Sequence, residues 1–168
     1  MKFKVANVKI SIKIPAIPLD IVFKIAKLKN INSTLHNNFI VLQSKFTFII
    51  FKARNSIENH INITKIPKLN QITEALFEIE SILNCYIINK KIDNIIASSN
   101  LFRNLSLVNI VKNKKFPKIK YNNQKFPGLF ITFERGTAII FHSGKIVIVG
   151  CKKTKHIKCI MKNIVANI

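Results

Sequence analysis

Acidic side chains are scarce in this chain of 168 residues, which has 7 Asp and Glu against 28 Lys and Arg and a formal net charge of +21. Such a charge opposes folding by self-repulsion unless the working partner is a polyanion. We therefore expect a nucleic acid partner, with an anionic membrane surface as the competing expectation. Composition drift in an AT-rich genome explains the abundant Asn and Ile, but it does not explain the shortage of acids.

Long hydrophobic runs and paired cysteines are also missing. No run approaches the roughly 18 apolar residues that a membrane span needs, and the start of the chain alternates polar and apolar residues without the apolar core of a secretion signal. The three cysteines are an odd number without a paired spacing. We expect free thiols rather than a disulfide framework, no membrane partner, and a location inside a cell.

Patterns that carry catalysis are absent as well. The chain has only 4 glycines and no glycine-rich loop that could cradle a nucleotide. Three of the seven acids lie on one predicted helix, so no carboxylate cluster is available for a pair of metal ions. Cys151, His156 and Cys159 have a spacing that fits no zinc finger or ribbon. We expect no enzyme, no cofactor, no bound metal and no small-molecule substrate.

Strand and helix patterns alternate along the chain and predict an α+β fold with an ample core, since 48% of the residues are hydrophobic. Val8 to Ile14 alternates strictly, which predicts a strand with one buried face. Spacing and turn residues predict a helix over 17–28, a loop over 30–38, a hairpin of 39–43 with 46–51, and a helix over 69–83. In the second half we expect a strand over 86–98, a helix over 101–111, a hairpin around 134–136, a strand over 145–149 and a closing helix with Val165 on its inward face.

Two motifs in the last third resemble the second repeat of the TATA-binding protein core. They are Lys125-Phe126-Pro127-Gly128-Leu129 and the run from Ile139-Ile140-Phe141 through His142-Ser143-Gly144-Lys145 to Gly150. Ile92-Asp93-Asn94-Ile95-Ile96 matches a strand of the same family, so the resemblance covers about residues 90–168. Residues 1–89 resemble the first repeat more weakly, because Asn7 and Phe39 precede Asn94 and Phe126 by 87 residues.

The resemblance implies a saddle in which two pseudo-symmetric repeats, residues 1–85 and 86–168, form one curved antiparallel sheet with helices on the convex side. It implies a transcription initiation factor that binds A·T-rich promoter DNA through the minor groove and bends it by wedging phenylalanines between bases. The wedge pairs would be Phe39 with Phe51 and Phe126 with Phe141. The full set of residues expected at the DNA is Asn7, Lys9, Phe39, Phe51, Asn94, Ile96, Phe126, Ile139, Phe141, Lys145, Val147 and Val149.

The same resemblance implies partners and a location. General transcription factors or RNA polymerase would join the protein on double-stranded DNA, in the nucleus or in a viral transcription compartment. Before Phe126 this chain has Asn122-Asn123-Gln124-Lys125 where the family has an acidic loop that engages an initiation factor. The alternative is a basic module of the same fold that binds other transcription factors or RNA without preference for TATA sequences.

Overall fold

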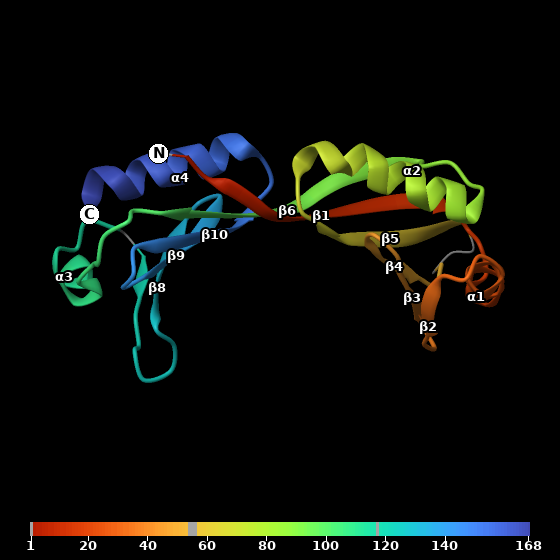
Figure 1. The fold of residues 1–168 in the computed structure, drawn as a ribbon, viewed down its shortest axis with the longest axis horizontal. Coiled ribbons are helices and arrows are strands. Elements are labelled where there is room, and N and C mark those ends of the chain that lie inside the picture. The colour runs from red at the N-terminus through yellow and green to blue at the C-terminus, as the bar shows by residue number, and fades with distance from the viewer. Residues whose placement is uncertain (1, 54–56, 117) are drawn as a thin grey trace. The chain divides into compact units, whose positions relative to one another are not determined.

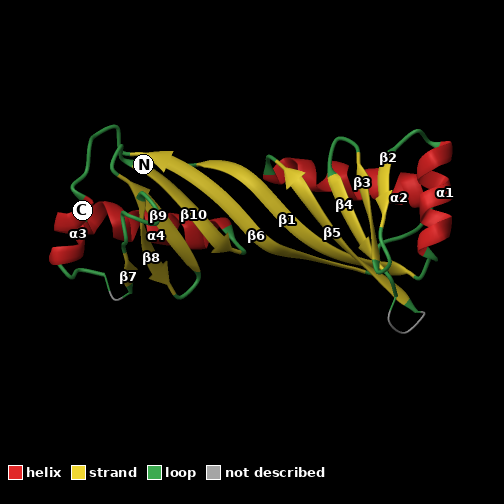
Figure 2. Cartoon of the chain, turned by 90° about the horizontal axis from the view of Figure 1, so that it is seen from below, coloured by secondary structure: helices red, strands yellow, loops and turns green. Residues whose placement is uncertain are grey.

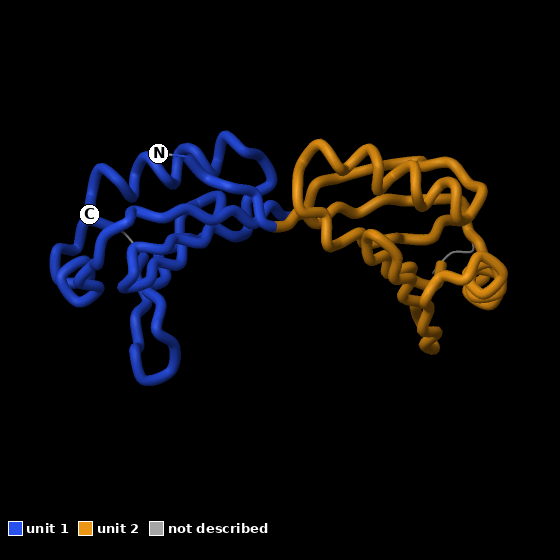
Figure 3. The backbone as a smooth tube through the Cα atoms, in the orientation of Figure 1, with its two compact units in different colours: residues 1–6, 94–168 blue, residues 7–93 orange. Residues whose placement is uncertain are grey.

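The computed structural model describes residues 2–53, 57–116 and 118–168. The chain divides into two compact units, one formed by Asn7–Asp93 and the other by Met1–Ala6 together with Asn94–Ile168 (Figure 3). We call them the 7–93 unit and the 94–168 unit. Within the described residues, both halves of the chain run in the same order, from a long strand through a helix and four further strands to a second, longer helix.

The first half contains β1 (Lys4–Pro15), α1 (Leu19–Leu28), β2 (Asn32–Leu35), β3 (Phe39–Gln43), β4 (Thr47–Phe51) and β5 (Glu58–Ile66). A 3-10 turn at Leu69–Gln71 leads into α2 (Ile72–Leu83). The strands of the 7–93 unit are antiparallel and lie in the order β2, β3, β4, β5, β1. The predicted 39–43 and 46–51 hairpin is confirmed, with its turn at residues 44–46.

The second half contains β6 (Asn89–Asn100), α3 (Leu107–Lys112), β7 (Ile119–Lys120), β8 (Gly128–Phe133), β9 (Gly136–Phe141), β10 (Lys145–Cys151) and α4 (Thr154–Asn167). The strands are again antiparallel and lie in the order β6, β10, β9, β8, β7. The predicted hairpin around residues 134–136 and the strand that starts at Lys145 are therefore confirmed.

Each unit has one strand face covered by its long helix and one face without a helix. Figure 1 shows α2 lying along the strands of the 7–93 unit and α4 lying along those of the 94–168 unit. The alternating residues of β1 from Val8 to Ile14 are at most 2% exposed and lie on the covered face, as the sequence predicts. We call the opposite strand face of each unit its open face. Figure 2 looks onto the strands, with α2 and α4 behind them.

Three sequence predictions about elements are wrong in part. The expected loop over 30–38 contains β2, which pairs with β3 from Asn32↔Gln43 to Leu35↔Ile40. The helix expected over 101–111 begins only at Leu107, after Ser106 Oγ accepts a hydrogen bond from Asn109 N at 3.4 Å. Val165 is 47% exposed, because the buried stripe of α4 runs through Ile157, Ile160, Met161 and Ile164.

None of the described helices is both long enough and apolar enough to cross a membrane.

Candidate nucleic-acid interface

Two phenylalanine rings lie together at one end of the open face of the 7–93 unit. Phe39 on β3 is the direct cross-strand partner of Phe51 on β4, and their ring centroids are 6.0 Å apart. The next pair on these strands, Ile40 and Ile50, is fully buried. Because neighbouring residues of a strand point to opposite faces, both rings belong to the open face. The structure thus brings together the first pair of predicted wedge residues.

Two histidines flank this pair of rings. His36 stacks on Phe39 with ring centroids 4.3 Å apart and an interplanar angle of 24°. The His60 ring centroid lies 5.9 Å from that of Phe51. The loop before β3 and the strand β5 therefore each supply one imidazole to the rings of the hairpin.

The 94–168 unit has a corresponding pair of rings. The centroids of Phe126 and Phe141 are 5.9 Å apart, and Phe126 also lies 5.1 Å from Phe130. A Cβ at Gly128, the cross-strand partner of Phe141, would lie 2.6 Å from the Phe126 ring. Only a glycine leaves room for this ring over β8, and 39% of the Phe126 side chain stays exposed.

Asn94 occupies the centre of β6 and its amide is held in one orientation. Gly150 N donates to Asn94 Oδ1 at 2.7 Å, so both hydrogens of the amide nitrogen remain free to donate elsewhere. Asn7 is the corresponding residue of β1. Its Oδ1 atom is buried and has no hydrogen-bond partner among the described residues.

Both asparagines lie beside a kink in the neighbouring strand. The register of β10 against β6 shifts next to Gly150, whose φ is 81°. In the first half, the register of β1 against β5 shifts at the same place, and Lys65 has the left-handed φ of 59° there. Gly150 reaches its asparagine through a backbone hydrogen bond, whereas no such bond to Asn7 is present within the described residues.

Aliphatic side chains fill the open face between Asn94 and the rings of the 94–168 unit. Ile139 on β9 is the cross-strand partner of Val147 on β10, and both are half-buried. They alternate with fully or almost fully buried residues, as Ile96 also does on β6, and Val149 follows the almost fully buried Ile148. These four residues form an apolar surface on the open face.

Cations lie along or beside both open faces. Lys145 is exposed at the start of β10, directly after the tight turn in which Gly144 N donates to Phe141 O at 3.0 Å. Lys9 is half-buried on β1, and Lys13 forms a 2.7 Å ion pair with Glu58. Lys13 is therefore partly neutralised, while Lys9 has no ion pair within the part of the chain that the structure describes.

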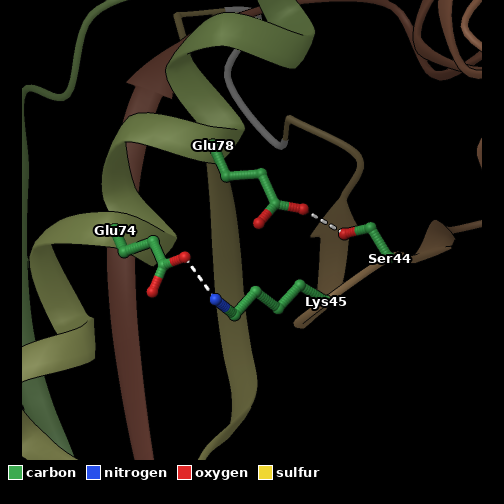
Figure 4. A network of polar contacts seen from close by, with 4 residues as sticks. All are labelled: Ser44, Lys45, Glu74 and Glu78. Atoms are coloured by element: carbon green, nitrogen blue, oxygen red, sulfur yellow. Dashed lines mark hydrogen bonds and ion pairs between the residues drawn. The ribbon is translucent and has the colours of Figure 1, made fainter.

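Two of the acids on α2 are bound by the turn between β3 and β4 (Figure 4). Lys45 forms an ion pair with Glu74, and Ser44 Oγ donates to Glu78. The hydrogen bond from Lys45 is the main cause that lowers the pKa of Glu74 below its usual value. These contacts join the hairpin that carries Phe39 to the helix on the covered face.

Sequence reasoning missed several residues around the first pair of rings. Asn59 is 1% exposed, and its amide nitrogen donates to Phe51 O at 2.9 Å while its Oδ1 accepts from Ile17 N at 2.5 Å. It thereby fixes the end of β4 that carries Phe51. Asn62, which like His60 lies on the open face, was also missed. The alternation of Ile61 and Ile63 on β5 is the signal that would have found both, whereas nothing local in the sequence marks Asn59.

No group of three His, Cys, Asp or Glu side chains that could hold a metal ion occurs among the residues that the structure describes. The cysteines at 85, 151 and 159 are free thiols, as predicted. Burial raises the pKa of the Cys151 thiol, and burial together with the Glu80 charge raises that of Cys85.

Comparison with known proteins gives matches in both sequence and fold. Residues 89–168 match the family model described as transcription factor TFIID, or TATA-binding protein. A TATA-box-binding protein of Thermococcus kodakarensis is 39% identical over 70 residues, covering 40% of this chain and 36% of the relative. One from Pyrodictium occultum is 37% identical over 79 residues, covering 46% and 39%. These alignments thus span less than half the length of the curated relatives.

The solved structure of Methanococcus jannaschii TBP matches nearly the whole chain. The TM-score is 0.82 at 24% sequence identity, with 99% of this chain and 98% of that chain covered. This match confirms the expected α+β fold class for both halves, including the half whose sequence resembles the family only weakly.

Proposed function

Since the chain is a divergent TATA-binding-protein-like protein, we propose that it is a transcription initiation factor that binds A·T-rich promoter DNA in the minor groove and bends it. The observation that carries the proposal is the pair of rings on the open face of each unit, next to strands that present an asparagine. The proposed role is recognition of DNA rather than catalysis.

The open face of the 94–168 unit suits the minor groove of A·T pairs. These pairs present only the acceptors adenine N3 and thymine O2, and the fixed amide of Asn94 has two hydrogens to donate. The apolar surface of Ile96, Ile139, Val147 and Val149 fits the remaining base edges, which offer no donor. We propose that Asn7 and Lys9 contact base edges or sugars in the other half of the element.

The rings would act as wedges. Inserting an apolar side chain between two base pairs costs a few kcal/mol because the bases lose their stacking. This cost is offset by the larger surface that bent DNA presents to the protein. The TATA-binding protein is itself a standard example of this mode. Phe126 with Phe141, and Phe39 with Phe51, are placed as pairs 5.9 and 6.0 Å apart between ring centroids. Lys145 would hold a phosphate beside the second pair.

Affinity would come largely from phosphate contacts, as the net charge of +21 implies. The logarithm of the binding constant should then fall with the logarithm of salt concentration by about 0.9 for each phosphate neutralised.

Partners proposed for the DNA complex are general transcription factors or RNA polymerase, in the nucleus or a viral transcription compartment. Because Asn122 to Lys125 carry no acid, we propose that contacts with an initiation factor differ from those of the family at this loop.

Bending of a short A·T-rich duplex, measured by energy transfer between dyes at its ends, tests the proposal. The wild-type protein should bend the duplex, and the Phe126→Ala/Phe141→Ala double variant should bend it much less. Phe77→Ala removes a ring that is 70% exposed on α2, away from the open face, and serves as the matched control. Equal bending by the double variant and the wild type would contradict the wedge assignment.

A parallel titration separates the alternative function. A basic module without TATA preference would bind A·T-rich duplex, G·C-rich duplex and structured RNA with similar affinity at one salt concentration. A clear preference for the A·T-rich duplex supports the initiation factor.

A further inference from the structure

The two units present different side chains at corresponding positions of their open faces. Asn62 on β5 lies opposite Ser11 and Ile49 on its neighbouring strands. Val147 on β10 lies opposite Ser98 and Ile139 in the same way. The neighbours are thus alike in both units, while the central residue is an amide in one and aliphatic in the other.

A second difference lies two residues after each asparagine. The 7–93 unit has Lys9 two residues after Asn7, and the 94–168 unit has Ile96 two residues after Asn94. Both side chains are half-buried. The open face of the 7–93 unit therefore has a cation and an amide where that of the other unit has only aliphatic groups.

Asn62 keeps hydrogen-bonding capacity for a ligand. His60 Nε2 lies 3.2 Å from Asn62 Oδ1, and an amide oxygen can accept two hydrogen bonds. The second lone pair of Oδ1 and the amide hydrogens are therefore available. No hydrogen bond of the Lys9 ammonium is found within the described residues.

This difference bears on the one feature by which the minor groove distinguishes base pairs. A G·C pair adds the guanine N2 amino donor to the acceptors that all pairs share. An aliphatic surface pressed against that amine leaves it buried without an acceptor, which is costly. An amide oxygen can accept from it, and a lysine can donate to the shared acceptors of any pair.

We propose that the open face of the 7–93 unit accepts a G·C pair in its half of the DNA element, whereas that of the 94–168 unit requires A·T pairs. Asn62 is the residue that determines this tolerance, with Lys9 adding affinity that does not depend on sequence. The element is consequently directional. The inference rests on the proposed function, because it assigns a half-site to each open face.

The first test measures the affinity of the protein for three duplexes. The first duplex is an all-A·T element, the second has a single G·C pair in one of its halves, and the third has one G·C pair in each half. The wild-type protein can orient itself on the second duplex, so its affinity should fall by no more than about threefold. The third duplex puts a G·C pair against the aliphatic face in either orientation, and affinity should fall about tenfold or more.

Orientation gives the second test. Cys159 is exposed on α4 of the 94–168 unit, and a dye attached there, in a Cys85→Ser background, reports which DNA end lies near this unit. Energy transfer should be stronger to the end farther from the single G·C pair. Moving the pair into the other half should reverse the preference.

Exchanges between the two faces identify the residues. Asn62→Val together with Lys9→Ile should raise the loss of affinity for the single G·C pair from no more than about threefold to about tenfold or more, and it should abolish the reversal. Val147→Asn should restore binding to the element with two G·C pairs. Lys158→Ile removes one charge on α4, outside both open faces, and should leave the affinity ratios as in the wild type.

The outcomes separate this inference from the proposed function. If the protein binds the all-A·T element no better than a G·C-rich duplex, the proposed function fails and the inference fails with it. If the A·T preference holds but a single G·C pair lowers the affinity of the wild type by about tenfold or more, or the energy transfer does not reverse, only the inference is overturned. Retention of the reversal in the Asn62→Val/Lys9→Ile variant overturns the assignment to these residues.

Discussion

Replacing either of two glycines in the 94–168 unit by alanine should have very different consequences. Gly144 and Gly150 both lie in the left-handed region, with φ of 78° and 81°. A Cβ at position 144 would lie 2.4 Å from the backbone oxygen of Arg103, whereas the nearest atom at position 150 is Gly136 Cα at 3.6 Å. The conformational strain is common to both substitutions, but the clash with backbone occurs only at Gly144.

The expected magnitudes follow from these two terms. A left-handed conformation costs a residue with a Cβ about 1–2 kcal/mol, and the lower entropy of the unfolded alanine chain offsets about 0.4–1 kcal/mol of this. Gly150→Ala should therefore destabilise the protein by roughly 0.5–1.5 kcal/mol. Relief of the overlap at Gly144 requires a backbone shift that adds about 1–3 kcal/mol. We expect Gly144→Ala to cost about 2–4 kcal/mol in total.

The clash at Gly144 also bears on function. Leu101 N donates to Gly144 O at 3.0 Å and Leu105 N donates to His142 O at 2.8 Å, so the turn and the segment after β6 are held together. Moving this segment would displace Lys145, the proposed phosphate ligand. The Gly144→Ala protein should therefore bind DNA more weakly than the Gly150→Ala protein.

Urea unfolding of the two variants and the wild type, with the slopes compared as well as the midpoints, measures the free energies. Lys65→Gly serves as a comparison variant, because Lys65 has the left-handed φ of 59° at the corresponding kink of the 7–93 unit. This substitution should stabilise the protein slightly or leave its stability unchanged. Equal destabilisation by alanine at positions 144 and 150 would refute the reasoning.

Two other expectations concern titratable groups. Lys45 lowers the pKa of Glu74 below its usual value. This contact therefore stabilises the folded protein above the unfolded-state pKa, and the stabilisation is lost as the pH falls through the folded-state pKa. Wild type should exceed Glu74→Gln in stability at neutral pH, and the difference should vanish in acid; a difference that persists in acid contradicts the assignment. Alkylation followed by mass spectrometry should modify exposed Cys159 first and Cys151 only on unfolding, since burial raises the pKa of the Cys151 thiol. Equal rates at the two cysteines would contradict this order.

Elements with their own periodic pattern were predictable from the sequence. β1 alternates over its buried length, and α4 carries its apolar residues at helical spacing. β2 was not predictable, because Asn32-Ser33-Thr34-Leu35 has no alternating apolar pattern and is ordered by its pairing with β3. The two-residue strand β7 (Ile119–Lys120) likewise exists only through its pairing with β8.

The candidate interface divides in a similar way. Because successive side chains of a strand point to opposite faces, Phe39 lies on the face opposite that of the buried Ile40. The face that carries the ring could therefore be deduced from the sequence. The hydrogen bond from Gly150 to Asn94 could not, because it depends on a register shift between strands that are far apart in sequence. The stacking of His36 on Phe39 depends in turn on the path of the loop before β3.

Residues 2–6 belong to the unit formed by the end of the chain, where Ser99 Oγ donates to Lys2 O at 2.6 Å. A single cleavage of the chain near residue 93 would therefore not release two intact units. It would separate the 94–168 unit from the opening residues of the chain, which belong to it. Anyone who wishes to study that half alone has to permute the gene, joining the opening residues to the fragment that follows Asp93.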